Sequence, residues 1–339
     1  MSGKSIVTFL TMLSSTDMKA AVLHQPGAAE QIRLEQRKIP KPGNDQVLVR
    51  IKAFGLNRSE LMTRKGLSPD VHFPRVLGIE CVGQVVSDPS GDFQPGEKVA
   101  AFMGGMGRQY DGSYAAYAVL PKNILSTFES TLSWEILGAL PEMFQTAFGS
   151  LHLALGIQPG ETLLIRGGTS SVGLLAAQLA KLAGLKVIAT TRDQTKTTLL
   201  KDNGADEVLI DNGHLLAQLQ TSMMSGVNKV LELVGTPTLK DSLACTAAFG
   251  KVCMTGMLSE QWSIKDFDPM GYIPATVSLT VYDSGQFRVE HAAFQSFVKL
   301  IEQGEIIPPI KRIFHLDEIV QAHQFMESNA GGGKIVITT

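Results

Sequence analysis

The chain of 339 residues is longer than one typical hydrophobic core, so its length predicts two domains. Its 44% hydrophobic and 18% charged residues are typical of a folded globular protein and exclude a disordered one. A formal net charge of −2 without blocks of like charge excludes nucleic acid as the main ligand.

The first residues, 1–17, hold one cation, Lys4, ahead of the apolar stretch 6–13. This order faintly resembles a signal peptide, but only one positive charge precedes the apolar stretch and no small-residue cleavage site follows it. A second methionine, Met18, directly precedes a strand-like segment. We therefore interpret residues 1–17 as an N-terminal extension, with a secretory signal as the alternative.

Short strands between Pro and Gly turns dominate the first half of the chain. Apolar alternation predicts strands at 46–52, 81–86, 98–102 and 114–120, with turns at 40–43 and 94–97. This spacing is typical of a small barrel or sandwich.

From residue 142 onward, strands and helices alternate. The pattern predicts helices at 142–155, 172–183, 195–203, 215–224 and 239–248, and strands at 162–166, 186–190, 207–210, 229–233 and 250–255. Such alternation indicates a parallel sheet with helices on both faces. The tail predicts helices at 289–303 and 316–326 and strands at 310–314 and 334–338; periodicity leaves open whether it completes the first domain.

A dinucleotide-binding loop is indicated where the strand 162–166 meets the helix 172–183. Free N–H groups at a helix start attract phosphate if side chains stay out of the way. Gly168, Ser170 and Gly173 occupy the three positions of the G-x-G-x-x-G fingerprint, with serine replacing the middle glycine. The predicted phosphate-binding residues are Gly168, Thr169, Ser170, Ser171 and Val172. A tight turn that binds no ligand is the alternative.

The end of the next strand indicates which nicotinamide cofactor is used. An acidic side chain there would bind the ribose hydroxyls of NAD, but the chain has Thr191 and Arg192, followed by Lys196. A guanidinium can pair with the 2′-phosphate of NADPH. We therefore predict NADPH as the cofactor, with solvated surface cations as the alternative.

The three cysteines are Cys81, Cys245 and Cys253, and no CxxC pair occurs. This argues against a disulfide framework and favours a reducing compartment, so we expect a cytoplasmic location. No apolar run reaches the ~20 residues of a membrane-spanning helix, so we expect no membrane partner.

Several motifs occur in an order that resembles the medium-chain dehydrogenase/reductase superfamily, and within it the zinc-free quinone oxidoreductase group. Besides the loop 167–173, they are KAAV (19–22), GLNRSEL (55–61), LGIECVG (77–83), DGSYAAY (111–117) and GKIV (333–336). The resemblance implies an α/β fold in which a doubly wound parallel Rossmann sheet is inserted into a GroES-like, β-rich catalytic domain.

The resemblance also implies a division of the chain. It gives a catalytic domain at 18–141, an NADPH-binding Rossmann domain at 142–284, and a C-terminal completion of the catalytic domain at 285–339. Members of the family commonly form homodimers through an edge strand of the nucleotide sheet, and the matching segment here is 276–282.

Metal content can be predicted from the ligand positions. Zinc-dependent relatives carry cysteine where this chain has Asn57 and histidine where it has Ile79, and Glu80 alone cannot form a zinc site. We therefore expect no metal. Asn57 matches an asparagine of the quinone oxidoreductase group and is the predicted catalytic residue, with a turn residue bonded to its own backbone as the alternative.

Further cofactor contacts follow from the resemblance and from the strand ends. Thr146 matches a threonine that contacts the nicotinamide ribose, although a hydroxyl bonded within its own helix is the alternative. The strand ends and the tail add Leu233, Val234, Gly235, Thr255, Gly256, Asn329 and Lys334.

Together these features predict an NADPH-dependent reductase that transfers hydride to a small-molecule quinone or α,β-unsaturated carbonyl without zinc. An enoyl-thioester reductase and a non-catalytic NADPH-binding protein remain as alternatives.

Overall fold

A computed structural model describes residues 16–220, 225–328 and 332–339. Most of the predicted extension 1–17, the end of the predicted helix 215–224 and the predicted cofactor residue Asn329 lie outside these ranges. The chain divides into two compact units: unit 1 comprises 1–128, 314–324 and 337–339, and unit 2 comprises 129–313 and 325–336.

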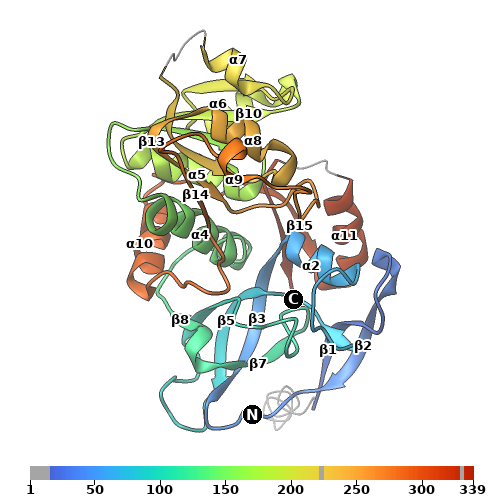
Figure 1. The fold of residues 1–339 in the computed structure, drawn as a ribbon. Coiled ribbons are helices and arrows are strands. Elements are labelled where there is room, and N and C mark those ends of the chain that lie inside the picture. Colours follow the sequence, from blue (N-terminus) through green and yellow to red (C-terminus); the bar gives the residue numbers. More distant parts are fainter. Residues whose placement is uncertain (1–15, 221–224, 329–331) are drawn as a thin grey trace, which may run out of the picture. The chain divides into compact units, whose positions relative to one another are not determined.

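Unit 1 is built mainly from strands in two sheets (Figure 1). The smaller has the order β2-β1-β4, and the larger the order β15-β16-β3-β5-β6-β8, with β7 also pairing with β3. Along β3, Val47, Val49 and Ile51 are buried whereas Arg50 is exposed, which explains why the alternating sequence forms a strand with one face on the core. The strands are β1 (Asp17–Leu23), β2 (Ile32–Lys38), β3 (Gln46–Leu56), β4 (Arg75–Val76), β5 (Glu80–Ser87), β6 (Lys98–Phe102), β7 (Tyr117–Pro121), β8 (Leu125–Thr127), β15 (Ile310–His315) and β16 (Lys334–Thr338).

The helices of unit 1 are short. They are the 3-10 turns η2 (Ala29–Gln31), η3 (Lys122–Ile124) and η6 (Leu316–Glu318), with α2 (Arg58–Arg64) and the start of α11 (Ile319–Glu327). The limits of the two units fall within β15, α11 and β16.

Unit 2 contains a six-stranded sheet in the order β11-β10-β9-β12-β13-β14, in which every neighbouring pair is parallel. The chain starts at β9, adds strands toward one edge and then crosses to the other side at β12. This is the doubly wound order, whose ligands bind outside the carboxyl ends of the strands where the order reverses. The strands are β9 (Thr162–Arg166), β10 (Lys186–Thr191), β11 (Glu207–Ile210), β12 (Val227–Glu232), β13 (Thr246–Met254) and β14 (Ser278–Val281).

Helices flank this sheet (Figure 1). Leu164, Ile188, Val230 and Val252, which pair with one another on four adjacent strands, form part of one buried cluster on one face of the sheet. The residues that follow them toward the other face, Ile165, Leu231 and Cys253, are also buried, so both faces are covered. The helices are α3 (Trp134–Leu137), α4 (Pro141–Phe148), the π-helical η4 (Gly149–Leu155), α5 (Ser171–Leu182), η5 (Gln194–Lys196), α6 (Thr197–Asp202), α7 (Leu215–Gln220), α8 (Thr236–Ala244), α9 (Pro269–Tyr272) and α10 (His291–Glu302). Among the described residues, no helix combines the length and apolar character needed to cross a bilayer.

Three of the differences between predicted and observed elements have an evident cause or change of geometry. The predicted helix 239–248 ends at Ala244, because residues from Thr246 onward already pair with β12. The predicted strand 114–120 begins only at Tyr117, since Ala116 instead donates its N–H to Lys19 of β1. The predicted helix 142–155 changes from α to π geometry at Gly149.

The compact units also differ from the predicted domain limits, which fell at 141/142 and 284/285. Residues 129–141 and 285–313 belong to unit 2. The physical reason is packing: Phe297 and Phe294 of α10 contact Phe144 of α4, with ring centroids 4.3 and 5.9 Å apart. Aromatic contacts of this kind tie α10 to the rest of unit 2.

Candidate functional site

The loop between β9 and α5 has the geometry of an anion-binding helix start. The N–H groups of Thr169, Ser171 and Val172 have no hydrogen-bond partner within the described residues, and all three residues are partly exposed. A Cβ on Gly173 would lie 2.7 Å from the carbonyl oxygen of Gly168, so only glycine permits this close turn. The loop therefore presents free donors at the positive end of a 12-residue helix.

Ser170 has a structural role in this loop. It is the N-cap of α5: its Oγ accepts the N–H of Gly173 at 3.1 Å and donates to the carbonyl of Gly167 at 2.9 Å. Its hydroxyl hydrogen is thus used within the loop, so the side chain shapes the turn and the neighbouring N–H groups face outward.

The rim of the loop is formed by the residues after β10. Thr191 is buried and its hydroxyl donates to the carbonyl of Asp193, whereas Arg192 is exposed and Lys196 partly exposed. Asp193 is the cap of η5: hydrogen bonds from the Thr195 hydroxyl and N–H hold its pKa below the ordinary value. Its Oδ1 is therefore engaged in capping, and the Arg192 guanidinium beside it is exposed to solvent.

A buried ionic cluster that the sequence reasoning missed lies directly behind the loop. Arg166, the last residue of β9, is fully buried; its Nε and Nη2 each donate to Asp211 at 2.8 Å, and its Nη1 donates to Asp241 at 2.7 Å. Burial raises the pKa of Asp211, but the hydrogen bond and charge of Arg166 outweigh it, so this pKa lies below the ordinary value. The cluster ties β9 to the residue after β11 and to α8.

Glu232, at the end of β12, organises the predicted contacts 233–235. Its Oε1 accepts the N–H groups of Val234 and Gly235 at 2.8 and 3.0 Å, and the Ser242 hydroxyl donates to its Oε2. Its backbone carbonyl accepts the N–H groups of Thr255 and Gly256. The structure thus brings these five predicted residues together at the carboxyl ends of β12 and β13, although the N–H groups of Val234, Gly235, Thr255 and Gly256 are already bonded within the protein.

Thr146 and Lys334 meet through a residue that was not predicted, Glu142. Thr146 Oγ1 donates to Glu142 Oε1 at 2.5 Å, and Lys334 Nζ lies 4.0 Å from Glu142 Oε2. Ser150 continues the same helical face: its Oγ donates to the Thr146 carbonyl and lies 2.9 Å from Thr255 Oγ1. The spacing 142, 146 and 150 is a sequence signal that could have revealed this polar row.

In unit 1, Asn57 is the N-cap of α2 and faces two buried carboxylates. Its Nδ2 donates to Glu80 Oε1 at 2.8 Å and is 3.4 Å from Glu60 Oε1, while Glu60 Oε2 accepts the Asn57 N–H at 3.0 Å. The amide orientation is therefore set by the carboxylates.

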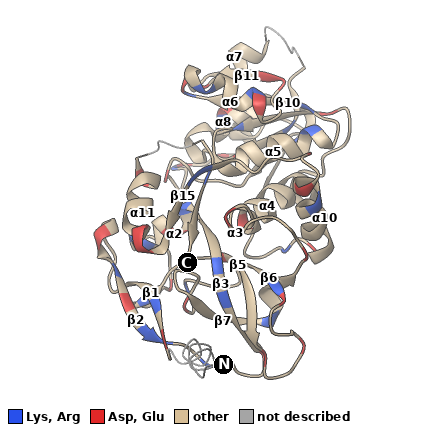
Figure 2. Ribbon diagram, turned by 180° about the vertical axis from the view of Figure 1, so that it is seen from behind, with Lys and Arg blue, Asp and Glu red and all other residues tan. Residues whose placement is uncertain are grey.

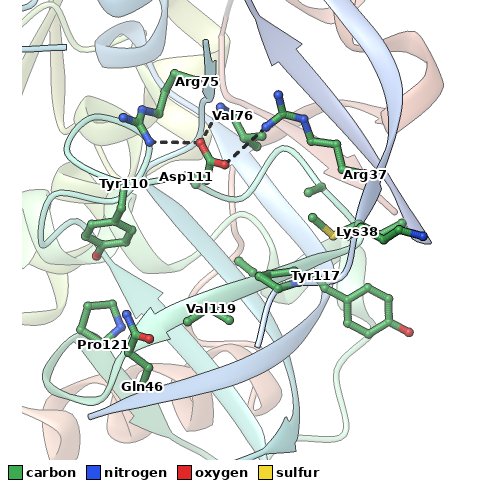
Figure 3. A pocket seen from close by; sticks show the side chains of 15 residues that line it. Arg37, Lys38, Gln46, Arg75, Val76, Tyr110, Asp111, Tyr117, Val119 and Pro121 are labelled. Carbon is green, nitrogen blue, oxygen red and sulfur yellow. Dashed lines mark hydrogen bonds and ion pairs between the residues drawn. The ribbon is translucent and has the colours of Figure 1, made fainter. Parts of the chain in front are cut away.

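Unit 1 also contains a separate hollow of about 520 Å³, lined by β2 and β7 (Figure 3). Arg75 and Arg37 face Asp111 there, at 3.1 and 3.7 Å. Figure 2 shows that the basic end of β2 lies next to an acidic residue of the same strand, and Arg37 pairs with Glu35 at 3.5 Å. None of the predicted site residues lines this hollow.

The comparisons with known proteins agree with this geometry. Residues 43–130 match the family model of the alcohol dehydrogenase GroES-like domain, and residues 171–303 match that of the zinc-binding dehydrogenase. The chain belongs to the medium-chain dehydrogenase/reductase superfamily. The predicted α/β fold, with a Rossmann sheet inserted into a GroES-like domain, is confirmed.

Known proteins similar to this chain align with nearly its whole length. The quinone oxidoreductase of Rattus norvegicus is 26% identical over 94% of this chain and 97% of its own. The acryloyl-coenzyme A reductase of Sulfurisphaera tokodaii is 26% identical over 94% and 99%. A mycobacterial protein solved in complex with NADPH has a TM-score of 0.83 and 25% identity, covering 95% of this chain and 100% of its own. The chain is accordingly an oxidoreductase with a nicotinamide cofactor and a small-molecule substrate.

The residues do not fit the zinc implied by the name of one family model. Across residues 16–220, 225–328 and 332–339, no group of three or more His, Cys, Asp or Glu side chains could hold a metal ion. At the position of the metal ligands, Glu80 accepts a hydrogen bond from Asn57, and neighbouring Ile79 offers no donor atom.

Proposed function

We propose that this protein is a zinc-free, NADPH-dependent reductase of quinones or α,β-unsaturated carbonyl compounds. The observation that carries the proposal is the row of free N–H groups on Thr169, Ser171 and Val172, at the start of α5 and at the switch point of the sheet. A bound reduced nicotinamide supplies the hydride. The other proposed cofactor contacts are those predicted from the sequence, including Gly168, Ser170, Thr191, Lys196 and Asn329.

NADPH is favoured over NADH by the charges beyond the loop. The N–H groups would hold the pyrophosphate, and the exposed guanidinium of Arg192 would pair with the 2′-phosphate. The acid next to it in sequence, Asp193, caps η5 through its Oδ1, which accepts both hydrogen bonds from Thr195. We propose Arg192 as the main determinant of cofactor preference.

Asn57 is the proposed catalytic residue. Without zinc, a substrate carbonyl must be polarised by hydrogen-bond donors. The 2.8 Å bond from Asn57 Nδ2 to Glu80 Oε1 orients the amide, and Asn57 is the proposed hydrogen-bond donor to a substrate oxygen. The protein's contribution is orientation and exclusion of water, together with this donor.

We also propose a second candidate substrate class and a homodimeric assembly. The similarity to an acryloyl-coenzyme A reductase supports an enoyl thioester as the second candidate substrate. A homodimer is supported by β14, which lies at the edge of its sheet with Val281 largely exposed.

The proposal is tested by following NADPH and NADH oxidation with a 1,4-quinone, an enone and acryloyl-coenzyme A. We expect turnover with the quinone or the enone and a clear preference for NADPH. Arg192→Asp should lower the NADPH/NADH ratio of kcat/KM about ten- to hundredfold, since one charge-assisted hydrogen bond contributes about 1.5–3 kcal/mol. The control is Arg33→Asp, an equal charge change at an exposed position in β2.

The outcomes are distinguishable. An unchanged cofactor ratio in Arg192→Asp would refute the role of this guanidinium. Turnover of acryloyl-coenzyme A alone would favour the enoyl-thioester reductase. Saturable NADPH binding without hydride transfer to any of the acceptors would indicate a non-catalytic protein.

A further inference from the structure

Glu142 occupies an unusual position for a carboxylate. It lies in the first turn of α4 with a side chain only 12% exposed, and its neighbour across the contact, Lys334, is 1% exposed. A Glu at a helix start is ordinarily solvated and favourable to the helix dipole. Here it is partly buried between two residues that the sequence assigns to the cofactor.

The contact between Glu142 and Thr146 determines whether the Thr146 hydroxyl can donate or accept a hydrogen bond. A threonine inside a helix commonly donates to the backbone carbonyl four residues earlier. Thr146 Oγ1 instead donates to the side chain of Glu142, at 2.5 Å. A hydroxyl has a single hydrogen, so with that hydrogen on the carboxylate, Thr146 can only accept a hydrogen bond from a ligand.

The contact between Glu142 and Lys334 offsets the charge of the buried ammonium. An ammonium buried without an anion is costly, and the Glu142 carboxylate lies 4.0 Å from Lys334 Nζ. One carboxylate therefore sets the hydrogen-bond direction of Thr146 and balances the charge of Lys334. Ser150 then fixes the same helix to Thr255 at the end of β13, so the group of residues is held as one assembly.

We infer that Glu142 is a positioning residue for the nicotinamide half of the cofactor. It makes Thr146 an obligate hydrogen-bond acceptor, suited to the amide N–H of the nicotinamide carboxamide or to a ribose hydroxyl. The inference rests on the proposed function only in placing a nicotinamide cofactor in unit 2. It is independent of the 2′-phosphate, so it applies to NADPH and NADH alike.

The test uses the full chain and measures Kd for NADPH and NADH by fluorescence titration, with KM and kcat for the best acceptor. Glu142→Gln removes the charge and can present an amide N–H to Thr146, so that the hydroxyl is no longer held as an acceptor, and Thr146→Val removes the hydroxyl. We expect each to raise Kd for both nucleotides about fivefold, the effect of losing one hydrogen bond between neutral groups, while kcat at saturation changes less than KM. Thr146→Ser should restore wild-type binding.

The double variant distinguishes positioning from two separate structural effects. If Glu142 acts through Thr146, Glu142→Gln/Thr146→Val should bind nucleotide no more weakly than the worse single variant. Glu135→Gln, in the first turn of α3, is the control for a lost helix-start charge and should leave Kd unchanged.

Three results would overturn the inference: Kd of Glu142→Gln within twofold of wild type, multiplicative effects in the double variant, or the same loss in Glu135→Gln. Failure of the proposed function is recognised separately, because the wild-type chain itself would then bind neither nucleotide.

Discussion

Replacing Arg166 by methionine should destabilise unit 2 strongly, although Arg166 touches no surface. Its guanidinium is fully buried and makes three hydrogen bonds of 2.7–2.8 Å to the carboxylates of Asp211 and Asp241. Methionine fills much of the same volume but leaves both acids without their cation.

The size of the effect follows from the unpaired charges. Breaking a buried ion pair by removing one partner costs about 3–5 kcal/mol, because the remaining charge stays desolvated. For a domain of about 150–250 residues, each kcal/mol lowers Tm by about 2–4 °C. We therefore expect Arg166→Met to lower Tm by about 6–20 °C at pH 7. Arg166→Lys keeps the charge but loses the planar set of guanidinium N–H donors, so it should lower Tm by less.

The effect should depend on pH in a definite direction. In the wild type, burial raises the pKa of Asp211 but the Arg166 hydrogen bond and charge lower it further, so the folded-state pKa is below the ordinary value. The stability from this pair is then fully present above the unfolded-state pKa of about 3.9 and is lost as pH falls through the folded-state pKa.

In Arg166→Met, the pKa of Asp211 should shift in the opposite direction. Without the guanidinium, burial is opposed only by the Gly213 N–H and the charge of Arg192, so the pKa of Asp211 should rise relative to the wild type. Protonation then relieves the buried charge, so the difference in Tm between wild type and Arg166→Met should be largest near pH 7 and shrink toward pH 4. Differential scanning fluorimetry at both pH values measures it, with Arg33→Met as the exposed control. A difference below about 2 °C at pH 7, or one equal at both pH values, would refute the reasoning.

Two further predictions concern the site. Asn57→Leu should lower kcat more than tenfold while Kd for NADPH stays within about twofold, since it removes the proposed donor in unit 1 and leaves unit 2 intact; stopped-flow hydride transfer measures this, and an unchanged kcat contradicts the proposed role. Gly173→Ala would place a Cβ 2.7 Å from the Gly168 carbonyl oxygen, so the loop must shift and Kd for NADPH should rise at least about tenfold. Titration with NADPH checks it, and unaltered binding would show that the loop does not hold the pyrophosphate.

Local patterns were sufficient to predict most elements of unit 2. The apolar run 162–166, the small-residue loop and the helical period after it lie within about twenty residues of one another, and each depends only on neighbours in the chain. The Rossmann order was predictable for the same reason, since short connections between parallel strands permit few arrangements.

The cofactor site was only partly predictable. Gly168 and Gly173 are identifiable because the tight turn demands glycine, and Arg192 because it follows a strand. The partners of Thr146 and Ser170 were not predicted, since a hydroxyl has several possible acceptors and sequence does not select among them. Glu142 alone carried a usable signal, its spacing of four residues from Thr146.

The sequence by itself determined the class of fold and the phosphate-binding turn, because periodicity and glycine placement act over short distances along the chain. Only the tertiary structure decided that Arg166 pairs with Asp211 and Asp241, that α10 packs on Phe144, and that β13 starts at Thr246. In each case the deciding interaction joins segments distant in sequence or set by strand pairing, and burial of charge or aromatic surface outweighs local preference.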